Sequence, residues 1–234
     1  MSIAENILSI RQRIAAAAES CGRDAKEIML VGASKMNDAA ACREAIAAGI
    51  DALGENRVQE MTAKLADEAY RGAPLYFIGH LQRNKVRQVV GKVDLIQSVG
   101  SLPLLQEIEK EAAKQSIVQD ILLEVNIGRE EAKSGFLEEE VFAAAAEAKN
   151  CPHVCVKGLM TVPPVEVEAH DCIPYFEKVR ALYVDINEKL YDNHFEYLSM
   201  GMSGDFEDAI RAGATMVRVG SSIFGQRYYP DKHM

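Results

Sequence analysis

The sequence predicts an α/β fold in which eight parallel strands, each followed by a helix, close into a (β/α)8 TIM barrel. Eight short apolar segments recur along the chain, and helical segments separate them. These segments are continuous runs of Val, Ile and Leu, which is typical of strands covered on both faces. Eight such units fit a chain of 234 residues. The alternative, an open doubly wound sheet, would show about five or six strands and a glycine-rich first turn.

The chain opens with an extra N-terminal helix, because Ile3, Ile7, Ile10 and Ile14 recur every three or four residues. We expect this helix to cover the bottom of the barrel, with the isoleucine stripe in the core. The predicted strands are 28–35, 51–56, 74–81, 95–99, 120–127, 154–160, 197–202 and 216–222. The clearest helices between them are 38–49, 102–115, 138–150 and 173–190. No linker or change of composition divides the chain, so we predict one domain over residues 1–234.

Charge and composition exclude several classes of partner. The net charge is −9, from 35 acidic and 26 basic side chains, so we expect no nucleic-acid partner. The longest apolar runs are too short to cross a bilayer, and charged residues stand where a signal peptide needs an apolar stretch. Cys151 and Cys155 in "CPHVC" have no second pair, so we expect no metal site. We predict a cytoplasmic monomer with no membrane partner.

The first strand, in "LVGASKMND", ends on a lysine. Lys35 shares a face with Val31 and Ala33, because side chains alternate along a strand. Active sites of such barrels lie at the C-terminal ends of the strands. If this face is the interior, Lys35 reaches the mouth above an apolar floor. Burial there would lower its pKa and allow the neutral amine to form a Schiff base with a carbonyl. The alternative is a solvated lysine at a strand end.

The last two strands end in glycine and serine. Ser203 follows the seventh strand, and Gly220 and Ser221 end the eighth. Loops at these two positions commonly bind phosphate in barrels, because glycine allows close approach and hydroxyls and amides donate hydrogen bonds. We also expect Ser203 to cap the next helix. Asp205, just beyond, would repel an anion unless its carboxylate points outward.

Arg218 lies in the middle of the eighth strand, on the same face as Met216 and Gly220. A buried arginine needs a partner, because an unpaired charge is expensive inside a protein. One alternative is a salt bridge to a carboxylate such as Glu55 or Glu124. The other is a ligand.

A lysine for an aldehyde, a phosphate cradle and an inward arginine together fit pyridoxal 5′-phosphate (PLP). With these residues, the chain resembles the pyridoxal-phosphate homeostasis proteins, the YggS/PROSC family, which are similar in fold to the barrel domain of alanine racemase. The resemblance covers nearly all of residues 5–230. The motifs are "ASK" (33–35), "GENRVQE" (54–60), "FIGHLQRNK" (77–85), "VNIGREEAKSGF" (125–136), "GLMT" (158–161) and "LSMGMSGDFEDAIRAGATMVRVGSSIFGQR" (198–227).

The resemblance implies that Lys35 forms the aldimine and that Arg218 faces the pyridine nitrogen. The remaining implied cofactor-binding residues are Ser203, Gly220 and Ser221 at the phosphate, with Asn56, His80 and Met200 near the ring or the mouth. Two of these have ordinary alternatives: Asn56 as a helix N-cap, and His80 as a strand-end histidine with one hydrogen bond.

The chain departs from the family pattern at Arg57, where an aromatic residue is usual, and at Gly100, where an acidic residue is usual. The segment "GASKMND" around the lysine is also atypical.

A cationic Arg218 would keep the pyridine nitrogen unprotonated, so the cofactor would be a weak electron sink. We also expect no counterpart of the second domain of the racemases, because only about ten residues follow the predicted eighth strand. We therefore expect a non-enzymatic protein that holds PLP as a reversible lysine aldimine and takes part in intracellular PLP homeostasis. Expected partners are PLP-dependent apoenzymes or PLP-synthesising enzymes. The alternatives are a low-efficiency PLP-dependent amino-acid racemase and a class I aldolase with a Schiff-base lysine and no cofactor.

Overall fold

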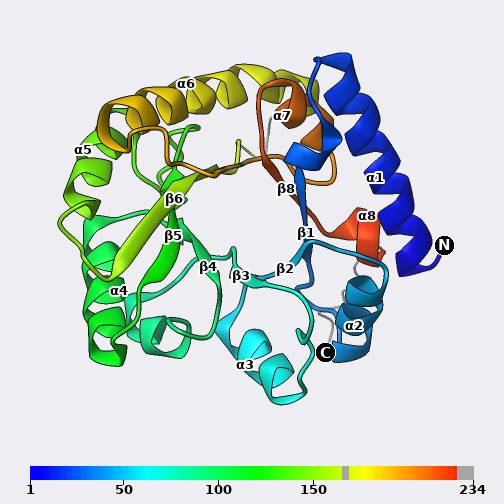
Figure 1. Cartoon of the computed structure of the whole chain (residues 1–234), viewed down its shortest axis with the longest axis horizontal. Helices are drawn as coiled ribbons and strands as arrows, with labels where there is room; N and C mark the ends of the chain where they lie inside the picture. Colours follow the sequence, from blue (N-terminus) through cyan, green and yellow to red (C-terminus); the bar gives the residue numbers. More distant parts are fainter. Residues whose placement is uncertain (165–168, 226–234) are drawn as a thin grey trace.

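The computed structural model describes residues 1–164 and 169–225, in which eight parallel strands form a closed barrel in sequence order (Figure 1). The strands are β1 (Met29–Ala33), β2 (Ala52–Glu55), β3 (Leu75–Phe77), β4 (Leu95–Val99), β5 (Gln119–Val125), β6 (Val154–Thr161), β7 (Tyr197–Ser199) and β8 (Met216–Val219). Each predicted strand overlaps one observed strand, so the predicted TIM barrel is confirmed. The barrel closes where β8 pairs with β1, with Val31 opposite Arg218 and Gly32 opposite Val219.

Helices surround the barrel (Figure 1). The α-helices are α1 (Ile3–Ser20), α2 (Ala39–Ala47), α3 (Val58–Ala66), α4 (Leu102–Gln115), α5 (Glu138–Ala148), α6 (Ile173–Leu190), α7 (Phe206–Arg211) and α8 (Ser221–Phe224). The 3₁₀ helices are η1 (Ala25–Glu27), η2 (Arg83–Gln88) and η3 (Ala169–Cys172). The prediction of an α-helix after every strand is wrong between β3 and β4, where only η2 occurs. Val86, Val89 and Val90 are buried there, and β-branched residues have low helix propensity. Within the described ranges, no helix combines the length and apolar character needed to cross a membrane.

The N-terminal helix α1 begins with a capping box, in which the Ser2 hydroxyl accepts from the Glu5 N–H and the Glu5 carboxylate accepts from the Ser2 N–H. Ile7, Ile10 and Ile14 of the predicted stripe are buried in the core, and Ile3 is half-buried. The helix does not cover the bottom of the barrel, however. It lies in the outer ring and packs against α7, α8 and α2 (Figure 1). The reason is that α7 and α8 have only 6 and 4 residues, so α1 covers the flank that these short helices leave open.

Apolar side chains form two cores, one inside the barrel and one between the strands and the helices. The interior core consists of Val31, Ala52, Tyr76, Leu95, Leu122, Met160 and Met216. Because side chains alternate along a strand, the face of β1 that carries Val31 and Ala33 is the interior face. The condition for an apolar floor beneath Lys35 is therefore met.

Candidate functional site

Lys35 is a half-buried residue of the turn that follows β1. The strand ends at Ala33, so the predicted strand was two residues too long at this end. Parallel pairing of β1 with β8 brings the C-terminal ends of both strands to the same mouth of the barrel. Lys35 therefore lies beside the loop that follows β8, as the sequence argument requires.

Arg218 projects into the barrel interior from β8 and is only 5 % exposed. One terminal nitrogen, Nη1, donates to the Ser199 hydroxyl at 2.6 Å, and Nη2 donates to the Thr161 carbonyl at 2.8 Å. Ser199 in turn donates to the Gln97 side-chain oxygen at 2.7 Å. Burial lowers the pKa of Arg218 to about 10, so the side chain stays cationic at neutral pH.

Neither of the carboxylates considered for Arg218 binds it. Glu55 lies on the outer face of β2 and forms an ion pair with Lys64 at 2.6 Å. Glu124 accepts a hydrogen bond from the Ser134 hydroxyl at 2.9 Å. Among the residues that the structure describes, no carboxylate pairs with Arg218, so the salt-bridge alternative is wrong. The two hydrogen-bond partners of Arg218 in residues 1–164 and 169–225 are neutral oxygens, and the guanidinium keeps its positive charge.

The loops after β7 and β8 meet at Ser203 and Gly220, where the Gly220 N–H donates to the Ser203 hydroxyl at 3.3 Å. A Cβ at Gly220 would lie 3.3 Å from the Ala33 carbonyl oxygen, so glycine allows the end of β8 to approach β1. Ser221 begins α8 and is exposed. N–H groups in the first turn of a helix have no partner within the helix and are available to an acceptor.

Ser203 does not cap the next helix, because the N-cap position of α7 is two residues later, at Asp205. Asp205 is buried, and its carboxylate accepts a hydrogen bond from the Met202 N–H. Burial raises the pKa of Asp205, and the nearby cationic Arg218 partly opposes this effect.

Asn56 and His80 line a cavity of about 550 Å³ at the mouth. Asn56 is not a helix N-cap, because Arg57 occupies that position in α3. The Asn56 side-chain oxygen is buried and has no hydrogen-bond partner in the described part of the chain. His80 is exposed in the loop after β3, and within residues 1–164 and 169–225 its ring forms no hydrogen bond. Met200 follows β7, but its side chain is fully buried in the outer core.

Glu124 is a further residue of this cavity that the sequence suggested only as a partner for Arg218. Glu124 follows the interior residue Leu122 by two positions in β5, so its side chain is on the same, interior face and lies nearer the mouth. Burial raises the pKa of Glu124, while the Ser134 hydrogen bond and the charges of Arg218 and His80 oppose the shift. The signal for it was an acidic residue near the C-terminal end of β5, on the same face as the interior residue Leu122.

The departures from the family pattern at Gly100 and Arg57 have a structural explanation. A Cβ at Gly100 would lie 2.5 Å from the Gly135 nitrogen and 2.7 Å from its Cα, so the loop before α5 packs directly on the end of β4. No side chain fits at this position. Arg57 is exposed and contacts the Glu60 carboxylate at 3.5 Å.

Sequence reasoning missed a buried polar cluster directly behind Lys35, formed by Ser34, Glu55, Lys64 and Tyr70. The sequence feature that could have revealed this cluster is the position of Lys64 in α3. Lys64 follows the buried Met61 by three residues and thus lies on the apolar stripe of the helix.

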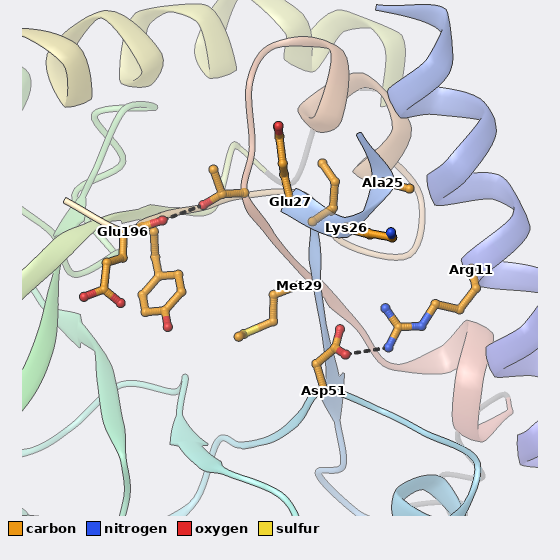
Figure 2. Close-up of a pocket in the computed structure, with 10 residues that line it drawn as sticks. Arg11, Ala25, Lys26, Glu27, Met29, Asp51 and Glu196 are labelled. Atoms are coloured by element: carbon orange, nitrogen blue, oxygen red, sulfur yellow. Dashed lines mark hydrogen bonds and ion pairs between the residues drawn. The ribbon is translucent and has the colours of Figure 1, made fainter. Parts of the chain in front are cut away.

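A cavity of about 500 Å³ lies at the opposite, N-terminal end of the barrel (Figure 2). Figure 2 shows Arg11 paired with Asp51, and their atoms are 2.7 Å apart. Glu196, also on the rim, binds Lys157 at 2.6 Å. Arg11, Asp51 and Glu196 thus have partners within the protein. Lys35, in contrast, lies beyond the C-terminal end of β1, at the other end of the barrel. The C-terminal mouth is therefore the candidate site.

Known proteins resemble this chain over nearly its full length. Residues 4–228 match the family described as alanine racemase, N-terminal domain. The pyridoxal phosphate homeostasis protein of Aquifex aeolicus is 43% identical over 231 residues, covering 98% of this chain and 100% of the relative. This chain belongs to the pyridoxal phosphate homeostasis protein family. The Escherichia coli K12 family member is 37% identical over 234 residues, with 98% of this chain and 99% of that protein covered.

Solved structures agree with this family assignment. PipY of Synechococcus elongatus PCC7942, solved with PLP bound, superposes with a TM-score of 0.83 at 30% identity, covering 96% of this chain and 100% of PipY. Alanine racemase of Clostridium difficile 630 superposes with a TM-score of 0.69 at 17% identity, covering 99% of this chain and 58% of the racemase. The racemase match demonstrates a shared barrel fold.

Proposed function

We propose that this protein binds PLP at the C-terminal mouth of the barrel, holds it as a reversible aldimine on Lys35, and takes part in intracellular PLP homeostasis as a carrier. The observation that carries the proposal is the pairing of β1 with β8, which brings Lys35, Arg218 and Gly220 to one mouth. The names of the relatives and the PLP-bound PipY structure support it.

Three features of the mouth fit this cofactor. The Asn56 oxygen is buried without a partner and can accept a hydrogen bond from a ligand. Gly220 leaves backbone accessible at the start of α8, where N–H groups suit a phosphate ester. Arg218 is a cation that forms no salt bridge with a carboxylate among the described residues, so it can donate a hydrogen bond to the neutral pyridine nitrogen. The proposed roles extend to Ser203 and Ser221 at the phosphate.

The charge of Arg218 favours a carrier over a dedicated enzyme. PLP, when bound, supplies an aldehyde for amines and an electron sink for carbanions, and the sink is effective when the ring nitrogen is protonated. A guanidinium with a pKa of about 10 is cationic at neutral pH and disfavours a proton on a nitrogen beside it. We therefore propose exchange of cofactor with PLP-dependent apoenzymes or PLP-synthesising enzymes as the role of the site. A racemase would instead exchange the α-proton of an amino acid in deuterated water.

Borohydride trapping tests the proposal. The PLP-loaded protein should be yellow, and reduction should add a phosphopyridoxyl mass to Lys35. Lys35→Ala should be colourless and carry no adduct. Lys26→Ala is the matched control, because Lys26 lies at the other end of the barrel, beside the N-terminal cavity. An adduct that persists in Lys35→Ala, or that maps to another lysine, would refute the proposed role of Lys35.

A further inference from the structure

The turn that carries Lys35 is anchored from the outer side of the barrel. The Ser34 N–H donates to the Gly54 carbonyl at 3.0 Å, and the Ser34 hydroxyl donates to the Glu55 carboxylate at 2.6 Å. The Lys64 ammonium, on α3, donates to the Ser34 carbonyl at 2.8 Å. All three polar groups of the residue before Lys35 are therefore bound to β2 or α3.

The residue after Lys35 is anchored as well. Met36 has a φ of +65°, a left-handed conformation that is uncommon for residues other than glycine. Its N–H donates to the Glu60 carboxylate at 2.9 Å. The other oxygen of Glu60 lies 3.5 Å from Arg57. Met36 and Arg57 both stand where the sequence departs from the family pattern, and both contact Glu60.

The stability of the fold does not explain the buried part of this arrangement. Glu55 is 0 % exposed and Lys64 is 7 % exposed. One oxygen of Glu55 accepts from Ser34, from Lys64 and from the Tyr70 hydroxyl, whereas the other is buried with no partner in the described ranges. Burial raises the pKa of Tyr70, so this hydroxyl remains protonated as a donor. A buried ion pair is often no more stabilising than a pair of apolar residues. What the pair does is hold Lys64 on the Ser34 carbonyl.

We propose that Glu60 and Lys64 of α3 are positioning residues for Lys35. They bind the backbone on either side of it and hold the turn in the conformation from which its amine reaches the cofactor aldehyde. The inference rests on the proposed function and deepens it. According to this inference, the position of the reactive lysine is fixed by α3, in the next βα unit of the barrel, and not by the strand that precedes the lysine.

Variants of Glu60 test the proposal by absorbance titration with PLP. Glu60→Ala removes the acceptor of the Met36 N–H and should weaken formation of the Schiff base at Lys35 about tenfold, the size expected for a hydrogen bond to a charged group. The pH at which its absorption band changes should shift too. Glu60→Gln keeps a side-chain oxygen and should stay within about twofold of wild type. Gln59→Ala, an exposed neighbour on the same helix, is the matched control and should leave binding unchanged.

The buried pair is tested by the double variant Glu55→Gln/Lys64→Met, which removes both charges together and leaves neither unpaired. It should unfold at a temperature similar to wild type while binding PLP more weakly. If it does not fold, the Glu60 variants decide the question. If Glu60→Ala matches Gln59→Ala both in PLP affinity and in the pH midpoint of the absorption band, the positioning role is refuted and the proposed function is not. Wild-type protein that forms no Schiff base at Lys35 would overturn the proposed function as well.

Discussion

Arg218→Met should lower the stability of the protein only modestly while greatly weakening PLP binding. Methionine has a similar length and no charge, so it fills the interior position without the guanidinium. Arg218 is almost completely buried and binds two neutral oxygens, one of Ser199 and one of Thr161. The substitution therefore removes two hydrogen bonds and one buried charge at the same time.

The two effects have opposite signs and similar sizes. Burial lowers the pKa of Arg218 from its usual 12.5 to about 10. At about 1.4 kcal/mol per pKa unit, the buried charge costs about 3 kcal/mol at neutral pH. Two hydrogen bonds from a charged donor contribute about 1.5–3 kcal/mol each. The free energy of unfolding should therefore fall by no more than about 3 kcal/mol, at or below the lower part of the range for large-to-small core substitutions.

Urea denaturation at pH 7, followed by circular dichroism without added PLP, measures this change. The absorption of the PLP-loaded variant reports binding in parallel. A loss of more than about 4 kcal/mol in Arg218→Met would show that the arginine stabilises the fold, contrary to the reasoning. Unchanged PLP affinity and an unchanged spectrum would show that the guanidinium does not face the cofactor.

Two further outcomes are expected. Burial raises the pKa of Glu124, so the native state disfavours its charged form, and a neutral replacement removes that penalty only where the carboxyl is ionised. Glu124→Gln should therefore raise the free energy of unfolding at pH 7, with the advantage over wild type shrinking as the pH falls to about 4; a constant difference in urea titrations across this range would contradict the assignment. Gly100→Ala should cost about 1–3 kcal/mol, because its Cβ would meet the Gly135 backbone, whereas Gly204→Ala, with no atom within 4 Å of the added Cβ, should change stability by less than about 0.5 kcal/mol; equal thermal midpoints for the two variants would contradict the packing argument.

The barrel was predictable because its strands are buried on both faces and so read as continuous apolar runs. Convergence of Lys35 and Arg218 followed from topology, since parallel strands end at the same mouth. Strand lengths were overestimated where polar residues continue the apolar run. The strands β1, β2 and β3 end before Lys35, Asn56 and His80, respectively. At these residues the backbone has left the sheet and forms the loops of the mouth.

The features that sequence reasoning missed depend on packing between distant segments. The sequence of α1 does not indicate that α7 and α8 are too short to cover their side of the barrel. The cluster behind Lys35 joins Ser34, Glu55 and Tyr70 to Lys64, and no periodic pattern links these positions. Binding of Arg218 to neutral oxygens rather than to a carboxylate likewise depends on which face of β2 carries Glu55, and this required the barrel register.

The first and last strands of the barrel are neighbours, with Gly220 seated against Ala33. A nascent chain leaving the ribosome presents the lysine early, but the adjacent wall of the proposed pocket does not exist until β8 has been synthesised. Binding of PLP would then require a completely synthesised chain with a closed barrel. Products of interrupted translation would carry the reactive amine without the means to retain the aldehyde.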